Sequence, residues 1–183
     1  MIDLKLTDNT WTLFLDRDGV INHEKKDDYI RNKTEFNFYG QVKDAMKLLS
    51  ERFGFIVMVT NQRGIGKGLM SEKDLSDIHD FMITEIVEAG GRVDRIYHAT
   101  ALDNNSFERK PNPGMAYRAK KDFPSIDLTK SIMVGNKMSD MEFGRNAGMF
   151  TVFVATTHPE TPFPHPAIDL RFDSLFDFAK YLA

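Results

Sequence analysis

Short apolar runs that each stop at a polar cluster constrain the fold of this chain more than any other feature. Five such runs recur, and apolar residues at helical spacing fill the segments between them; the runs cover residues 12–15, 55–59, 93–98, 131–134 and 150–154. Runs that are apolar on both faces are typical of parallel strands covered on either side. The alternation therefore predicts an α/β fold, a Rossmann-like open parallel sheet flanked by helices on both faces.

The helices are predicted at residues 41–53, 71–88, 113–121, 138–146 and 174–182. Ser71 with Asp74 three residues later is a typical helix N-cap, and Pro113 is suited to the first residue of a helix. A glycine-rich turn through Gly64, Gly66 and Gly68 and a loop over residues 156–166 complete the pattern. We expect a single domain over residues 1–183, with no large cap domain inserted between the strands.

Composition excludes several classes of function. The chain has no cysteine, which removes disulfides, thiolate nucleophiles and cysteine-based zinc sites. Its net charge of -3 and pI near 6.0 do not favour nucleic-acid binding, which usually needs a basic face. The N-terminus lacks the pattern of a signal peptide, and no apolar run is long enough to span a bilayer. We expect a cytoplasmic protein that binds neither membrane nor nucleic acid.

Polar side chains follow the first two predicted strands. Asp16 and Asp18 stand on alternate residues, and like charges that close repel unless a cation or a proton intervenes. Mg²⁺ is the natural cation because it prefers oxygen ligands and leaves room for phosphate oxygens. A solvated turn or an Asx cap is the alternative for this short motif alone. Thr60 and Asn61 follow the second strand, where a hydroxyl and backbone N–H groups suit a phosphate oxygen or simply begin a helix.

Two further clusters lie at the ends of later strands. Arg109 and Lys110 precede the proline-initiated helix, whose N-terminus also favours an anion, although an exposed basic turn is the alternative. Asn136 follows the fourth run of the sequence pattern, and Asp140 lies in the first turn of the next helix, where it could also compensate the helix dipole. Carboxyl ends of parallel strands share one edge of a sheet. We therefore predict one site from all four clusters.

Together these segments resemble the haloacid dehalogenase superfamily of aspartate-nucleophile phosphatases. Residues 15–22 (LDRDGVIN) resemble its first motif, residues 59–62 (VTNQ) its second, residues 109–115 (RKPNPGM) its third, and residues 134–140 (VGNKMSD) its fourth. Within the superfamily the similarity is greatest to the D-glycero-D-manno-heptose bisphosphate phosphatases and the related histidinol phosphatases. The resemblance covers nearly the whole chain.

The resemblance implies a role for each matched residue. Asp16 is the expected nucleophile, Asp18 the general acid and base, and Thr60 and Lys110 the groups that hold the phosphoryl oxygens. It further implies substrate contacts and Mg²⁺ ligands; the expected substrate-binding residues are Asn22, Asn61, Gln62, Arg63 and Arg109, and the expected metal ligands are Asp16, Asp18, Asn136 and Asp140. A monomer is the expectation that the family suggests.

The sequence departs from the family pattern at three places. Asn136 stands where an aspartate is usual, so a weaker metal site is expected, with Asp140 as a further ligand. Residues 99–108 lack the three cysteines and histidine that bind zinc in many relatives, so zinc is not expected. Arg63 replaces a serine; it either meets a second phosphate or carboxylate, or is a surface side chain.

These features predict an Mg²⁺-dependent phosphatase that acts on a small-molecule phosphate ester. The family resemblance makes D-glycero-D-manno-heptose 1,7-bisphosphate the favoured substrate. Histidinol phosphate or another small phosphoester is one alternative. A phosphosugar-binding protein with weakened catalysis is the other, and Asn136 is the residue that supports it.

Overall fold

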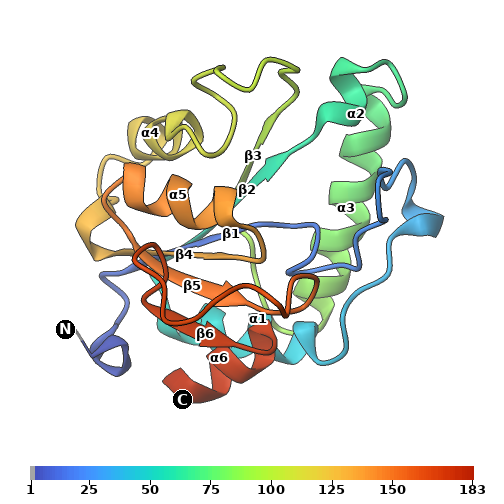
Figure 1. The fold of residues 1–183 in the computed structure, drawn as a ribbon. Coiled ribbons are helices and arrows are strands. Elements are labelled where there is room, and N and C mark those ends of the chain that lie inside the picture. Colours follow the sequence, from blue (N-terminus) through green and yellow to red (C-terminus); the bar gives the residue numbers. More distant parts are fainter. Residues whose placement is uncertain (1–2) are drawn as a thin grey trace.

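Residues 3–183, the part of the chain that the computed structural model describes, form an α/β domain around one six-stranded parallel sheet (Figure 1). The strands are β1 (Thr12–Leu15), β2 (Phe55–Asn61), β3 (Arg95–Ala99), β4 (Ser131–Gly135), β5 (Phe150–Val154) and β6 (Leu170–Phe172). Their order in the sheet is β3-β2-β1-β4-β5-β6. The chain thus builds outward from β1 on one side and then returns beside β1 with β4. The carboxyl ends of β1, β2 and β4 therefore meet where the strand order reverses, which is where ligands bind in such sheets.

Helices cover both faces of the sheet (Figure 1). They are α1 (Val42–Arg52), α2 (Arg63–Gly66), α3 (Glu72–Glu88), α4 (Gly114–Asp122), α5 (Met138–Asn146) and α6 (Leu175–Leu182), with three short 3-10 helices at Leu4–Leu6, Lys33–Glu35 and Leu128–Lys130. None of the helices in residues 3–183 combines the length and the apolar character needed to cross a membrane.

The two faces of β1 explain why its whole sequence is apolar. Leu13 and Leu15 are buried in a large cluster with α1, α3 and α6, whereas Phe14 is buried in a second cluster with α4 and α5. All three side chains are fully buried. Because β1 is hydrogen-bonded to β2 on one side and β4 on the other, it is held on four sides. This strand is therefore a rigid base for the residues that follow it.

The predicted fold class is confirmed, and two local predictions were wrong. The glycine-rich turn contains the short helix α2, and Pro113 is the N-cap of α4 and not its first residue. Residues 167–173, for which no element was predicted, contain the edge strand β6. Because α2 and β6 are only four and three residues long, neither gives a recognisable periodicity. The predicted capping box at Ser71 and Asp74 is confirmed.

Candidate active site

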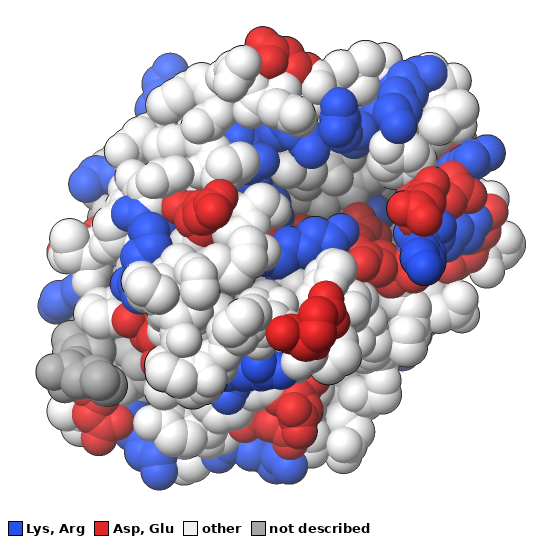
Figure 2. Space-filling view, viewed as in Figure 1, with Lys and Arg blue, Asp and Glu red and all other residues white. Residues whose placement is uncertain are grey.

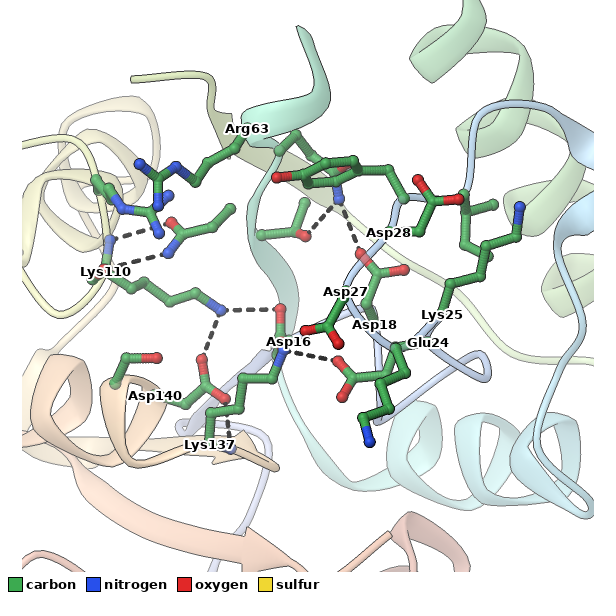
Figure 3. Close-up of a pocket in the computed structure, with 18 of the residues that line it drawn as sticks. Asp16, Asp18, Glu24, Lys25, Asp27, Asp28, Arg63, Lys110, Lys137 and Asp140 are labelled. Carbon is green, nitrogen blue, oxygen red and sulfur yellow. Dashed lines mark hydrogen bonds and ion pairs between the residues drawn. The ribbon is translucent and has the colours of Figure 1, made fainter. Parts of the chain in front are cut away.

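Asp16 lies directly after β1 and faces a lysine from a distant loop (Figure 3). The Lys110 ammonium lies 2.8 Å from Oδ1 of Asp16 and 2.7 Å from Oδ1 of Asp140, and it donates to the Val59 carbonyl oxygen at 2.9 Å. All three of these side chains are buried. The ammonium has three N–H groups, so each one has a partner within the protein.

The loop that carries Lys110 is fixed to the end of β2 by the Asn61 side chain. Nδ2 of Asn61 donates to the Lys110 carbonyl oxygen, and Oδ1 accepts from the Lys110 backbone N–H, both at 3.1 Å. Asp140 is fixed in a similar way, since its Oδ2 accepts from the backbone N–H groups of Asn136 and Lys137. The lysine and its second carboxylate are therefore held in place from both sides of β1.

Burial dominates the electrostatics of this triad. It raises the pKa of Asp16 to about 7, and the neighbouring carboxylates of Asp140 and Asp18 add to that rise, while Lys110 opposes it. Burial also works against the charge of Lys110, but Asp140 and Asp16 outweigh it and raise the pKa of the lysine. The lysine therefore remains a cation. Asp16 ionises less readily than a free aspartate, because burial opposes its negative charge more strongly than Lys110 favours it.

Asp18 has a different environment from Asp16. Both of its oxygens accept from the Arg17 guanidinium at 2.9 Å, and the side-chain amides of Asn22 and Gln62 each donate to it at 2.9 Å. Burial would raise the pKa of Asp18, but Arg17 and these amides outweigh it and hold the pKa below its usual value. The two aspartates therefore sit in environments that push their pKa values apart, which is common for carboxylates with different chemical roles.

Gln62 connects Asp18 to the hydroxyl of Thr60. Its Nε2 donates to Thr60 Oγ1 at 2.9 Å as well as to Asp18, and both Gln62 and Thr60 are buried while lining the same cleft. The structure thus brings Asn22, Asn61 and Gln62 to the site, with their amides directed at Asp18 or Lys110. These contacts show how the three residues order the charged groups.

Asn136 lies against the turn that follows Asp18. Gly19 has a φ of +90°, and a Cβ atom there would lie 2.0 Å from Nδ2 of Asn136, so this close approach requires glycine. Nδ2 donates to Thr157 Oγ1 at 2.6 Å, whereas Oδ1 is buried without a hydrogen-bond partner in residues 3–183. A buried carbonyl oxygen of this kind needs a partner.

The donor set fits a hard cation such as Mg²⁺. The unpartnered oxygen of Asn136 and the carboxylate of Asp16 are oxygen ligands of the kind that Mg²⁺ takes together with water and phosphate oxygens. Residues 3–183 contain no cluster of three or more acidic, histidine or cysteine side chains suited to a metal. Asp140 uses both oxygens on Lys110 and on backbone N–H groups. A cation here would therefore depend on few protein charges.

The site opens into a cleft of about 600 Å³. Besides the triad of Asp16, Lys110 and Asp140, two arginines line the cleft. They are Arg63, which donates to the Leu102 carbonyl oxygen at 2.8 Å, and Arg109. Nε of Arg63 and one terminal nitrogen of Arg109 are buried with no partner in the described residues. Burial and then the nearby charge of Arg63 lower the pKa of Arg109. Neither arginine forms an ion pair with another side chain of residues 3–183.

Several residues in and beside the cleft were given no role by the sequence analysis. Lys137 pairs with Glu24 across the cleft at 2.7 Å, and both are labelled in Figure 3 with Asp27 and Asp28. Figure 2 shows the hollow bordered by side chains of both signs. Arg17, the fully buried partner of Asp18, was also missed. The position of Arg17 between two aspartates could have indicated its role in the site. The acidic and basic residues 24–28 gave no comparable indication, because such charged runs are usually solvated.

Comparisons with known proteins agree with this geometry. A family model described as polynucleotide kinase 3 phosphatase matches residues 12–165. The D-glycero-alpha-D-manno-heptose-1,7-bisphosphate 7-phosphatase of Campylobacter jejuni is 36% identical over 145 residues, covering 79% of this chain and 82% of the relative. The D-glycero-beta-D-manno-heptose-1,7-bisphosphate 7-phosphatase of Escherichia coli K12 is 35% identical over 177 residues, covering 92% and 91%.

A solved structure extends the similarity to the whole fold. The D,D-heptose 1,7-bisphosphate phosphatase from B. bronchiseptica, complexed with magnesium and phosphate, superposes with a TM-score of 0.84 at 26% identity, covering 94% of this chain and 97% of the other. Fold and site together define a phosphatase of the haloacid dehalogenase superfamily. Within that superfamily, the chain belongs to the family described as polynucleotide kinase 3 phosphatase. The curated relatives given above are named as heptose bisphosphate 7-phosphatases.

Proposed function

We propose that this phosphatase removes one phosphate from a small sugar bisphosphate, with D-glycero-D-manno-heptose 1,7-bisphosphate as its substrate. The single observation that carries the proposal is the cleft that joins the Asp16–Lys110 pair to a second, uncompensated pair of cations, Arg63 and Arg109. The relatives that are 34–36% identical and named for this substrate support it.

Asp16 is the proposed nucleophile. Its carboxylate attacks the phosphorus of the ester, and an aspartyl-phosphate forms as the bond to the leaving oxygen breaks. Lys110 and the Thr60 hydroxyl stabilise the charge on the phosphoryl oxygens. Asp18 donates a proton to the leaving alkoxide and then accepts one from the water that hydrolyses the aspartyl-phosphate. The network around Asp18 suits the second task, because it favours the ionised carboxylate.

Mg²⁺ is the proposed cofactor, held by the Asp16 carboxylate, the Asp18 carbonyl oxygen and Oδ1 of Asn136. When bound, it neutralises charge between the nucleophile and the phosphate. Asp140, which the family resemblance suggests as a ligand, uses both of its oxygens within the protein. We therefore propose that Asp140 holds Lys110 and orders the loop of Asn136. The absence of cysteine from the sequence supports a zinc-free site.

The second phosphate is proposed to bind Arg63 and Arg109. Each guanidinium presents planar N–H donors that match the oxygens of a phosphate, and each has an unused donor atom. Burial and then the charge of Arg63 lower the pKa of Arg109, and a phosphate between the two arginines would offset the second of these effects. Asn22, Asn61 and Gln62 contribute by ordering the groups that contact the substrate. We further propose that the protein acts as a cytoplasmic monomer.

The test is release of inorganic phosphate from a panel of esters with Mg²⁺ present. The panel contains the heptose 1,7-bisphosphate, histidinol phosphate, a sugar monophosphate and a 3′-phosphorylated oligonucleotide, each with wild type and Asp16→Asn. The highest kcat/KM is expected for the heptose bisphosphate. A higher value for any other ester would contradict the proposed substrate, and release that persists in Asp16→Asn would contradict the mechanism.

Histidinol phosphate is the second candidate, and the acidic residues of the cleft favour it. Glu24, Asp27 and Asp28 line the cleft, and Glu24 has Lys137 as its partner. Asp28 pairs with Arg31, so Asp27 is the carboxylate that would receive the ammonium group of an amino alcohol phosphate. The guanidinium groups of Arg63 and Arg109 oppose this candidate, because a substrate with an ammonium group in place of a second phosphate brings them no counter-charge.

A further inference from the structure

Arg17 stands between the two aspartates of the site, yet its side chain is fully buried and does not line the cleft. Its guanidinium points to the core side of Asp18. The NH2 nitrogen donates to both oxygens of Asp18 at 2.9 Å, and Nε lies 3.3 Å from Oδ1. The ring of Phe36 lies 6.0 Å from the guanidinium carbon. Arg17 therefore contacts Asp18 from the side away from the substrate.

The remaining end of the guanidinium contacts His79, a buried residue of α3 that lies 62 positions along the chain. The NH1 nitrogen is 3.1 Å from Nε2 of His79. A guanidinium has only donors, so Nε2 must be the acceptor and the ring must be neutral with its proton on Nδ1. Burial, and next the charge of Arg17, lower the pKa of His79 to about 3, in agreement with a neutral ring.

His79 thus supplies the contact that sets the rotation of the guanidinium. One edge of Arg17 lies against the carboxylate of Asp18, and the NH1 end lies on the imidazole. Without an acceptor at Nε2, the NH1 group would be buried and unpaired, and the guanidinium would turn to find another partner. Because Arg17 is bound to both oxygens of Asp18, such a turn would pull the carboxylate against the amides of Asn22 and Gln62, which hold one oxygen each.

We propose that His79 is a positioning residue for the reaction: by fixing Arg17, it holds the Asp18 carboxylate where it can reach the leaving oxygen of the ester. The inference rests on the proposed function, in which Asp18 protonates the leaving alkoxide. Proton transfer in the transition state depends on the placement of the donor relative to the leaving oxygen. A rotation of Asp18 therefore costs rate wherever the leaving group needs that proton.

The test compares two leaving groups in His79→Leu and His79→Gln. The alkoxide released from the heptose 1,7-bisphosphate needs a proton, whereas the nitrophenolate released from p-nitrophenyl phosphate leaves without one. Leucine removes the acceptor and keeps an apolar side chain; glutamine restores a carbonyl acceptor near the position of Nε2. His98→Gln is the control, because its ring is 6.5 Å from that of His79 and pairs with Glu72 instead. The quantity compared is kcat/KM, which covers only the steps through aspartyl-phosphate formation.

In His79→Leu we expect kcat/KM for the heptose bisphosphate to fall about tenfold, through kcat, and that for p-nitrophenyl phosphate to fall less than about threefold. His79→Gln should recover most of the loss, and His98→Gln should match wild type with both substrates. Equal losses with the two substrates, or no loss with either, would overturn the inference while leaving the proposed phosphatase activity unaffected.

If His79→Leu does not fold, Arg17→Lys takes its place, since lysine keeps the charge but cannot contact Asp18 and His79 together, and the same selective loss is required. A wild type that hydrolyses neither substrate would overturn the proposed function, and the inference with it.

Discussion

The Lys110 ammonium lies 2.8 Å from Oδ1 of Asp16, so the loop after residue 109 supplies the counter-charge for the carboxylate at the end of β1. The two residues are 94 positions apart in the sequence and meet because β1 and β2 are neighbours. Asn61, at the end of β2, binds the Lys110 backbone and places the lysine beside β1. The sheet topology therefore creates the charge balance on which the proposed chemistry depends.

Lys110→Met is expected to lower kcat at least about a hundredfold, because methionine keeps the length of the side chain but removes the charge that stabilises the phosphoryl oxygens. It also leaves Asp16 and Asp140 buried beside each other, at a cost of about 3–5 kcal/mol in the free energy of unfolding. Activity assays and urea unfolding check both effects. Lys120→Met, on the exposed face of α4, is the control and should change neither quantity. A stable, active Lys110→Met would refute the role of the buried cation.

The raised pKa of Asp16 predicts a pH-dependent cost to stability. The pKa rises from 3.8 to about 7 on folding, so the folded protein holds this proton more tightly than the unfolded chain does. The favourable contribution of protonated Asp16 to the free energy of unfolding is therefore fully present below about pH 4, and it is lost progressively as the pH rises to about 7. Asp16→Asn removes the cost, so without Mg²⁺ the variant should be more stable than wild type by roughly 1–3 kcal/mol at pH 8.

Thermal unfolding in a metal chelator from pH 5 to pH 8 measures this difference. The gap between the two proteins should widen up to about pH 7 and then become constant. A gap that is independent of pH, or a variant that is less stable than wild type at pH 8, would show that Asp16 is ionised without strain in the folded protein.

The parallel sheet and its principal helices were predictable because each long element buries a continuous apolar face. Asp16, Lys110 and Asp140 were brought together by topology, since they follow strands or begin a helix at one edge of the sheet. The contacts that order them were not predictable. His79 reads as an ordinary buried residue of an amphipathic helix, and Glu24 as part of a solvated run. Only the packing of α3 and of the loop after β1 reveals their partners.

Asn136→Asp is expected to tighten Mg²⁺ binding by about tenfold, because it adds a charge where the protein offers a neutral oxygen. Calorimetric titration of Mg²⁺ into the substrate-free protein measures this directly, without any assay of activity. Asn104→Asp, in an exposed loop, is the matched control for the added charge. An unchanged affinity in Asn136→Asp would remove Asn136 from the proposed ligands.

Arg109→Ala and Arg63→Ala are expected to raise KM for the heptose bisphosphate about tenfold or more, with little change for p-nitrophenyl phosphate, which has no second phosphate. The reason is that both arginines line the cleft and neither forms an ion pair with another side chain of residues 3–183. Arg118→Ala, on the exposed face of α4, should leave both KM values unchanged. If KM rises equally for the two substrates, the arginines do not bind a second phosphate.

The covalent step at Asp16 is tested most directly by trapping it. Wild type is mixed with the heptose bisphosphate and Mg²⁺, and the reaction is quenched in acid within one turnover. The protein is then digested, and the mass of the peptide that contains Asp16 is measured by mass spectrometry. The burial of Asp16 beside Lys110 predicts a phosphoryl group on this carboxylate, which is absent in Asp16→Asn. Hydrolysis that proceeds with no phosphoryl group on Asp16 at any quench time would contradict nucleophilic catalysis by this residue.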